Sequence, residues 1–236
     1  LLRDGAMAEI SSSIAREDAR IIETFPEIES SAAGEPLLTG EVVVLAGLPR
    51  EPGGFINATV RGVTERSYAI RDAVRVVEGR RPRPGTNELL IGSGLVGRSR
   101  GAFLGGELEL ARTRWPIVGR MDAGGGAFES EIWADREKLA SAYERTAFSS
   151  VIAAVRSGAL EELERRVESD RRFAIKVERE DRYWAEAASG TATFIRVLGL
   201  FVSIVFSGGA VLGAMITMYA QVAARTREIA MMRAVG

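Results

Sequence analysis

The stretch VLGLFVSIVFSGGAVLGAMITMYAQVAA, Val197–Ala224, contains no charged side chain, although 27% of the residues in the chain are charged. At about 1.5 Å of rise per residue, the part from Val197 to Ala220 forms a helix of about 36 Å, long enough to cross a hydrocarbon layer of about 30 Å with some tilt. A helix buried in a globular core is the alternative, but such helices are usually shorter and carry polar residues on one side. The stretch predicts one membrane-spanning helix in contact with lipid.

The composition excludes several classes of function. The chain has 236 residues, a formal net charge of −1 and neither cysteine nor histidine. It therefore lacks thiolate nucleophiles, imidazole bases and the usual zinc ligands. Acidic and basic residues balance, and no basic block indicates nucleic acid. We expect no catalytic, cofactor-binding or metal site in this chain, and no nucleic-acid partner.

Short apolar runs separated by Gly, Pro and Asn predict strands upstream of the membrane helix. The runs are Glu41–Ala46, Ala58–Val63, Glu88–Ile91, Glu107–Leu110, Trp115–Val118, Ile132–Ala134, Ser150–Val155 and Phe173–Val177. Apolar spacing predicts helices over Ile10–Phe25, from an Asp135 cap to Tyr143, and through Leu160, Leu163 and Val167. The expected fold class is α+β: a domain of two lobes, discontinuous in sequence, with a small mixed sheet, followed by a long stalk and transmembrane α-helix.

No proline follows Asp181, and an apolar stripe leads from there into the membrane segment. The stripe consists of Tyr183, Trp184, Ala187, Ala188, Thr191, Phe194 and Ile195. We therefore predict a stalk helix over residues 181–196 that is continuous with the membrane helix. Trp184 as a membrane-interface anchor is an alternative, but it lies about 20 Å before Val197 along the helix. Packing within the stalk is the favoured interpretation.

Two patterns resemble catalytic or nucleotide-binding motifs, and a third motif is absent from the sequence. The G-x-G-x-x-G from Gly92 to Gly97 follows an apolar strand, but a long helix and a suitably spaced acidic residue are missing, so a glycine-rich turn is favoured. No Walker A sequence occurs, because neither lysine follows a glycine. Glu129, Glu131 and Asp135 form an acidic cluster that we interpret as a solvated edge.

The membrane segment carries small residues at regular spacing. Gly199, Ser203 and Ser207 recur every four residues, and Gly209 and Gly213 form a G-x-x-x-G pattern. Small residues let two helix backbones approach closely, which is how membrane helices associate in lipid. The pattern predicts packing against another membrane helix. The alternative is that glycine is simply common in membrane helices.

The residues after the crossing, Arg225–Gly236, read RTREIAMMRAVG. This segment resembles the signature R-x-R-E-I-(small)-x-x-R-A-(apolar)-G that follows the second membrane helix of the FtsX-like ABC transporter permeases, the family that includes the MacB macrolide exporters and the lipoprotein-release permeases. Four upstream segments are similar to strands of that family's MacB-like extracytoplasmic core domain: Val60–Val63, Glu88–Gly92, Gly105–Leu110 and Pro116–Gly119. Glu107 stands where many members carry Asp.

The resemblance implies how the chain is divided and located. Residues 1–180 would form the extracytoplasmic MacB-like core domain, 181–196 the stalk, 197–224 the transmembrane helix and 225–236 the start of a cytoplasmic coupling segment. Residues 1 to about 190 would lie outside the bacterial cytoplasmic (inner) membrane. Basic residues flank both ends of the crossing, so the orientation depends on the resemblance. The sequence would begin just after a first membrane helix, and two further membrane helices would follow Gly236.

The resemblance also implies the function and the partners. The chain would be the permease subunit of a bacterial ABC transporter and would relay the motion of an ATPase subunit to the outer domain, for efflux, lipoprotein release or similar work. ATP would bind the partner subunit, so this chain would be no enzyme. A second permease copy or paralogue would complete a dimer, with a periplasmic adaptor or lipoprotein as a further partner. The alternative is a membrane-anchored sensor or cell-division scaffold whose outer domain binds a peptidoglycan enzyme.

Transferred residue by residue, the family's signature assigns the coupling to the ATPase subunit to Arg227, Glu228, Ile229, Arg233, Ala234 and Gly236. The residues themselves fit this role: Ile229, Met232 and Val235 recur every three residues and give an apolar face. The charged residues offer charge-assisted contacts. A basic anchor on anionic lipid is the alternative, but it needs no ordered apolar face.

Overall fold

The computed structural model describes residues 1–6, 8–50, 53–170 and 172–236. Within the long C-terminal helix, the side chains of residues 186–194, 224, 227, 229 and 235 lie outside this description. The chain divides into two compact units, Leu1–Glu178 and Arg179–Gly236, and we describe each by itself.

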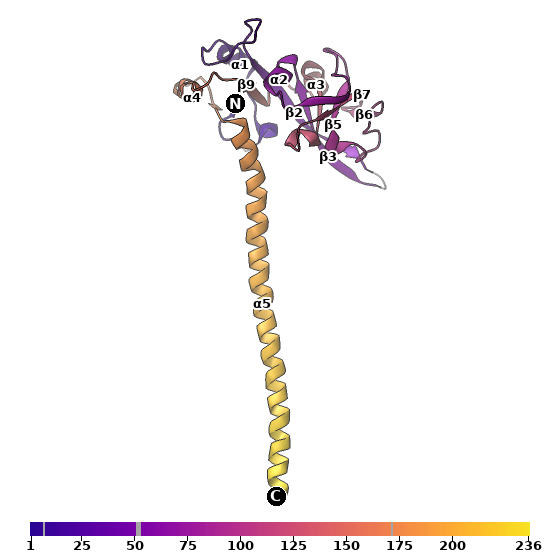
Figure 1. Ribbon diagram of the computed structural model, residues 1–236, viewed down its shortest axis with the longest axis vertical. Coiled ribbons are helices and arrows are strands. Elements are labelled where there is room, and N and C mark those ends of the chain that lie inside the picture. Colours follow the sequence, from indigo (N-terminus) through magenta and orange to yellow (C-terminus); the bar gives the residue numbers. More distant parts are fainter. Residues whose placement is uncertain (7, 51–52, 171) are drawn as a thin grey trace. The chain divides into compact units, whose positions relative to one another are not determined.

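The first unit is built of short helices and strands (Figure 1). In chain order they are β1 (Leu2–Arg3), η1 (Glu9–Ser11), α1 (Arg16–Glu23), β2 (Leu38–Pro49), β3 (Phe55–Val63), α2 (Glu65–Ile70), β4 (Arg75–Gly79), β5 (Leu89–Gly92), η2 (Ser93–Leu95), β6 (Glu107–Leu110), β7 (Thr113–Asp122), η3 (Ala127–Ser130), β8 (Glu131–Asp135), α3 (Arg136–Ala142), β9 (Ser150–Ala153), α4 (Leu160–Ser169) and β10 (Ile175–Lys176).

The main sheet of this unit is mixed, as predicted, but it is larger than the short apolar runs suggested. It has eight strands in the order β4-β7-β5-β8-β3-β2-β9, with β6 paired to β7. The β3–β8 and β5–β7 pairs are parallel, and the other pairs are antiparallel. Strands β1 and β10 form a separate antiparallel pair. The predicted mixed sheet followed by a long helix is confirmed.

The sheet buries side chains on both faces, because neighbouring residues of a strand point to opposite sides. In β8, Ile132 and Ala134 join the larger apolar core, to which α1, α3 and α4 also contribute. Trp133, between them, joins a smaller cluster that includes Tyr68 of α2. Figure 1 shows α1 and α4 near one end of the unit and β5, β6 and β7 near the other.

The helix predicted over Ile10–Phe25 is wrong in its first half. α1 begins only at Arg16, because Ile14 is extended and forms a β-bridge with Phe148. The Ile14 N–H donates to the Phe148 carbonyl at 2.8 Å, and the Phe148 N–H donates to the Ile14 carbonyl at 2.9 Å. A long-range pairing therefore overrides the local helical spacing.

Other predictions differ in extent. The Asp135 cap is confirmed, since its side chain accepts a hydrogen bond from the Lys138 N–H at 2.9 Å. The strand predicted over Phe173–Val177 is reduced to β10. Helix α2 and strands β1 and β4 were not predicted from the sequence.

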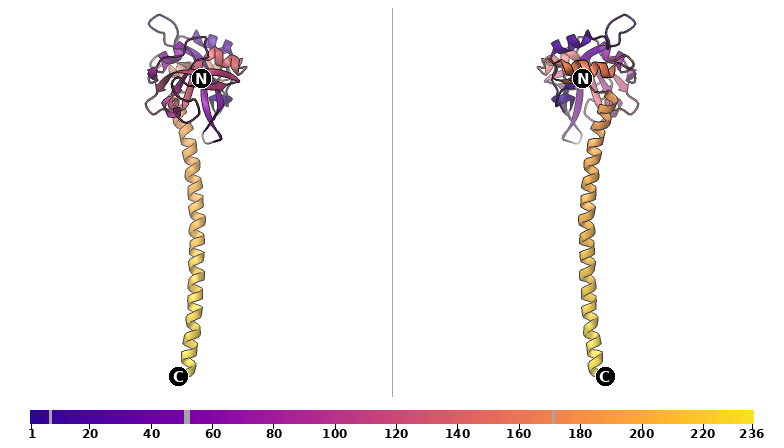
Figure 2. Two further views of the ribbon diagram at one scale, coloured as in Figure 1. Left: turned by 90° about the vertical axis from the view of Figure 1, so that its right-hand side faces the viewer. Right: turned by 90° about the vertical axis from the view of Figure 1, so that its left-hand side faces the viewer.

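The second unit is dominated by one helix, α5 (Glu180–Val235), of 56 residues. Both views of Figure 2 draw this helix without a break. Its segment Ile195–Ala223, 29 residues long, meets the length and composition expected of a membrane crossing, and none of its most apolar window is buried in the protein. Tyr183 and Trp184 near its start are half-buried, and their ring centroids lie 5.1 Å apart.

We predict that Gly40→Ala destabilises the first unit. A Cβ atom at position 40 would overlap the ring of Phe148, and overpacking of this kind costs about 1–3 kcal/mol. Gly47→Ala in the same strand is the control, because a Cβ atom there would meet the Phe55 ring at an ordinary contact distance of 3.9 Å. Chemical denaturation of both variants in detergent measures the difference. Equal unfolding midpoints for the two variants would show that this contact does not limit packing.

Candidate functional site

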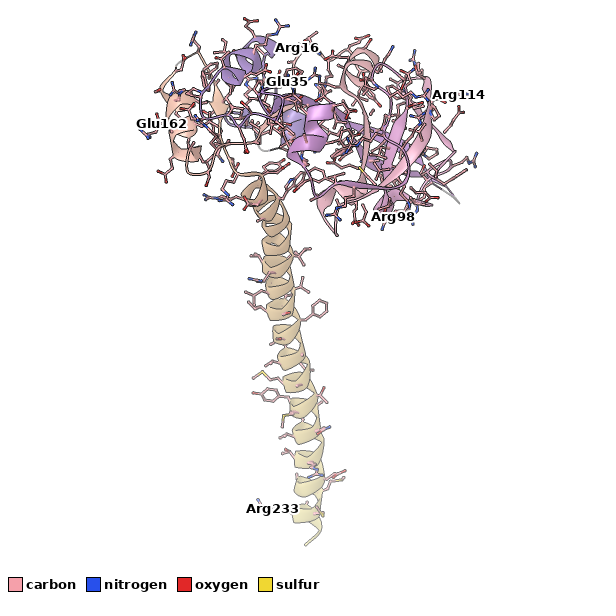
Figure 3. The ribbon with its side chains drawn as sticks, turned by 45° about the horizontal axis from the view of Figure 1, so that its top comes forward. Arg16, Glu35, Arg98, Arg114, Glu162 and Arg233 are labelled. Atoms are coloured by element: carbon pink, nitrogen blue, oxygen red, sulfur yellow. The ribbon has the colours of Figure 1, made fainter. Side chains whose placement is uncertain are left out.

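The predicted coupling residues lie on the last turns of α5, which continues through the coupling segment to Val235. Glu228, Arg233 and Ala234 are exposed, and Figure 3 shows Arg233 near the end of this helix. Gly236 follows the last helical residue. The side chains of Arg227 and Ile229 lie outside the described residues. The predicted coupling residues up to Ala234 therefore share one helix with the membrane-length segment.

The predicted packing residues occupy one side of α5. At about 100° per residue, Gly199, Ser203, Ser207, Gly209 and Gly213 fall within about 160° of the helix circumference. We call these five residues the small face.

The small face offers a neighbouring helix room for close contact and a hydroxyl, that of Ser203, which is already hydrogen-bonded. The Ser203 hydroxyl donates to the Gly199 carbonyl at 2.8 Å, within the helix itself. Apart from the backbone of the helix itself, no heavy atom of the described residues lies within 4 Å of where a Cβ at Gly199, Gly209 or Gly213 would sit. A second helix backbone can therefore approach this face closely.

The G-x-G-x-x-G pattern belongs to a tightly packed turn. The residues after Gly92 form η2, a short 3-10 helix. A Cβ at Gly92 or Gly94 would collide with the carbonyl of Glu129, so these glycines admit the backbone of η3. The turn lacks the long helix whose N-terminus holds pyrophosphate in a dinucleotide fold.

The interpretation of the acidic cluster as a solvated edge is wrong for Glu131. This side chain is buried, whereas Asp135 caps α3 and Glu129 accepts a hydrogen bond from the Gly125 N–H at 2.7 Å. Glu131 is buried because it pairs with Arg61, which is itself fully buried in the neighbouring strand β3.

Arg61 is the centre of a buried charge cluster, which we define as Arg61, Arg71, Glu9, Glu41 and Glu131. The Arg61 guanidinium donates to Glu131 at 2.7 and 2.8 Å, to Glu9 at 2.7 and 2.9 Å, and to Glu41 at 2.9 Å. Arg71 donates to the other oxygen of Glu41 at 2.6 Å. The cluster connects η1, β2, β3, β8 and the residue that ends α2.

Neutral groups complete the cluster. The Ser150 hydroxyl donates to Glu9 at 2.7 Å, and the Trp133 indole N–H donates to Glu131 at 3.0 Å. The Phe128 ring lies 5.5 Å from the Arg61 guanidinium carbon and 4.7 Å from that of Arg71. Aromatic faces attract guanidinium groups at this range. The cluster is therefore held by hydrogen bonds and by ring contacts.

The electrostatics keep Glu9 and Arg61 charged. Burial by itself raises the pKa of Glu9, but the charge of Arg61 and the hydrogen bonds from Arg61 and Ser150 outweigh it and lower that pKa to about 2. Burial likewise lowers the pKa of Arg61, while Glu131 and Glu9 raise it well above its ordinary value. Glu9 and Arg61 therefore stay charged at neutral pH, and we interpret the cluster as structural.

Sequence reasoning missed this cluster. Its available signal was the position of Arg61 inside an otherwise uncharged strand, ATVRGV, since a charge in the middle of a buried strand requires partners. The partners lie at positions 9, 41 and 131, and no local pattern relates these positions to residue 61.

Comparison with models of known protein families gives no match, and comparison with curated protein sequences gives none either. Among solved structures, the periplasmic region of MacB from Actinobacillus actinomycetemcomitans matches with a TM-score of 0.52 and 11% identity, covering 71% of this chain and 81% of that one. The extracellular domain of the noncanonic ABC-type transporter YknZ from Gram-positive bacteria gives 0.51 and 13%, covering 64% and 79%.

These similarities establish the fold. The chain contains a MacB-like domain of the type found outside the membrane in ABC-type transporters, which confirms the likeness read from the sequence motifs. At sequence identities of 11% and 13%, the comparisons support an assignment of the fold and of nothing more.

We predict that Glu9→Gln flattens the acid dependence of stability. With a folded pKa of about 2, against 4.5 ordinarily, Glu9 stabilises the fold above pH 4.5. This contribution, on the order of 3 kcal/mol, is lost as the pH falls from 4.5 toward 2. Urea unfolding followed by tryptophan fluorescence across this range measures it.

The control for this experiment is Glu162→Gln on α4, an exposed position whose side chain pairs with Arg165 at the surface (Figure 3). Its unfolding free energy should follow the same pH dependence as that of the unmodified chain. A Glu9→Gln variant with an unchanged slope would contradict the role assigned to Glu9.

Proposed function

We propose that this chain is part of the permease subunit of a bacterial ABC transporter and relays ATP-driven motion of a partner subunit to the extracytoplasmic domain. One observation carries the proposal: a MacB-like domain is followed directly by a helix that contains a membrane-length apolar segment and ends in the charged segment 225–236. Efflux, lipoprotein release or a similar mechanical task fits this organisation.

The continuity of α5 supports a mechanical role. At about 1.5 Å per residue, 56 residues span about 84 Å. The helix has no proline at which it would kink. A displacement of the segment 225–236 by a partner would therefore be carried along the same helix to the start of α5.

The proposed partner at the end of α5 is the ATPase subunit, which binds ATP itself. Glu228 and Arg233 are exposed and of opposite sign, so they offer charge-assisted contacts to that subunit. In this proposal the chain holds no cofactor and is not an enzyme. The segment 225–236 lies in the cytoplasm, residues 1 to about 190 lie outside the inner membrane, and an adaptor or lipoprotein meets the outer domain.

The small face is proposed to pack against a second permease copy or a paralogue. Glycine and serine at this face leave room for the close backbone contacts that packed membrane helices make. This arrangement joins two permease chains within the membrane, as a two-subunit ATPase pair would require.

Co-purification separates this proposal from the membrane-anchored scaffold. The chain, expressed in its native host with an affinity tag, should retain a nucleotide-binding subunit with a Walker A sequence. Retention of a peptidoglycan enzyme without such a subunit would overturn the proposal and favour the scaffold.

Charge reversal at the coupling segment should uncouple the two subunits. We expect Glu228→Lys and Arg233→Glu to insert normally in the membrane but to reduce the permease-dependent stimulation of ATPase activity about tenfold, the effect of losing one charge-assisted contact. ATPase rates of the reconstituted complex measure this loss. Arg165→Glu on α4 is the control for charge reversal, and stimulation equal to that of the unmodified chain in the α5 variants would contradict the assignment.

A bulky residue on the small face should weaken the dimer. We expect Gly213→Leu to reduce self-association in membranes about tenfold, because the side chain would hold the backbones apart. Gly208→Leu is the matched control, since position 208 lies about 140° from position 213 around the helix. Energy transfer between labelled chains in vesicles measures association. Equal effects of the two substitutions would show that the small face is not the interface.

A further inference from the structure

A small polar cavity of about 180 Å³ lies between α1, α2 and α3. Four arginines line it: Arg16 and Arg20 of α1, Arg66 of α2 and Arg136 of α3. Glu23 contributes a carboxylate to the same wall. Neither the proposed transport role nor the buried charge cluster uses this site.

Two of the arginines are held in fixed positions. Glu137 accepts hydrogen bonds on one oxygen, Oε1, from Arg16 Nη1 at 3.0 Å and from Arg136 Nε at 2.9 Å. Both guanidinium carbons lie over the Phe148 ring, at 4.9 and 5.0 Å from its centroid. Phe148 is buried. This arrangement brings two cations together on one ring and one carboxylate.

Backbone carbonyls fix the same two side chains further. Arg136 Nη1 donates to the Gly40 carbonyl at 3.1 Å, and Arg16 Nε donates to the Thr146 carbonyl at 3.2 Å. Gly40 is required for this geometry, because a Cβ atom there would displace the Phe148 ring. Among the described residues, no hydrogen bond uses Nη2 of either Arg16 or Arg136. Each guanidinium therefore keeps donors for a ligand.

The other two arginines also pair with carboxylates, of which Glu23 is half-buried and Glu17 and Glu35 are exposed. Arg66 donates to Glu23 at 2.5 Å and lies 3.6 Å from Glu35, while Arg20 lies 3.8 Å from Glu17. The Glu17 and Glu35 side chains are 74% and 66% exposed, and exposed pairs of this kind contribute little to stability. A ligand anion can replace Glu17 and Glu35 as partners of these arginines without breaking a buried contact. Figure 3 shows Arg16 and Glu35 in this part of the first unit.

We propose that this cavity binds a phosphoryl group. Arginine forks match the oxygens of phosphate. A phosphomonoester carries between one and two negative charges and three acceptor oxygens, so it can accept from more than two of the four guanidiniums at once, whereas a carboxylate offers two oxygens. The phosphoryl group belongs either to a small soluble ester or to a lipid headgroup, since both present the same chemistry.

Isothermal titration of the detergent-solubilised chain at constant ionic strength tests the proposal. The probes are inorganic phosphate, glycerol 3-phosphate and dihexanoyl phosphatidic acid below its micelle concentration. Saturable binding of inorganic phosphate or glycerol 3-phosphate supports the phosphoryl site in general, and binding of phosphatidic acid alone assigns the lipid source. Absence of saturable binding with all three probes overturns the proposal.

Variants assign the binding to this cavity. We expect Arg136→Gln to weaken binding about tenfold, the effect of losing one charge-assisted contact. Arg20→Gln, at an exposed position, should also weaken it, and a weakening here cannot be ascribed to misfolding. Glu23→Gln removes the carboxylate from the wall and should tighten binding, a gain that structural damage would not produce.

Arg165→Gln on α4 is the matched control, because it removes one exposed arginine from another part of the same unit. Its affinity should stay within about twofold of the unmodified chain. Equal affinities for Arg165→Gln, Arg20→Gln and Glu23→Gln would overturn the proposal by showing that phosphate binds elsewhere.

Discussion

The buried guanidinium of Arg61 is the interaction that constrains how the first unit packs. A charge without water costs several kcal/mol unless partners surround it, and here five hydrogen bonds reach three carboxylates. The cluster contains three carboxyl groups against the two guanidiniums of Arg61 and Arg71. Trp133 and Ser150 donate further hydrogen bonds to Glu131 and Glu9. Because these groups come from distant parts of the sequence, the sheet can satisfy Arg61 only in this one register.

The same sheet explains why the polar cavity exists. The parallel strands β3 and β8 are each followed directly by a helix, α2 and α3. The first turns of these two helices therefore lie side by side, at the carboxyl ends of neighbouring strands. Arg66 and Arg136 are carried there together, and the β-bridge of Ile14 to Phe148 brings Arg16 to the same place. The buried charge cluster thus lies on one face of the sheet, while the arginines at the carboxyl ends of β3 and β8 have N–H donors that no protein group uses among the described residues.

Local patterns predicted the elements whose stability is local. The Asp135 cap and the helix after it were correct, because one side chain and one backbone N–H decide them. The helix over Ile10–Phe25 was wrong in its first half, because the pairing of Ile14 with Phe148 is a long-range contact. The prediction of a solvated Glu131 was wrong for the same reason, because Arg61 comes next to Glu131 through the pairing of β3 with β8.

The sequence by itself determined the membrane-length helix, the small face and the charged end of α5, since hydrophobicity and helical spacing act within one segment. It also indicated the MacB-like domain through short strand motifs. Only the tertiary structure decided the strand order, the buried charge cluster and the arginine-lined cavity. Each of these depends on residues that strand pairing brings together. The charge of a residue and its spacing along the chain do not predict which distant residue will lie beside it.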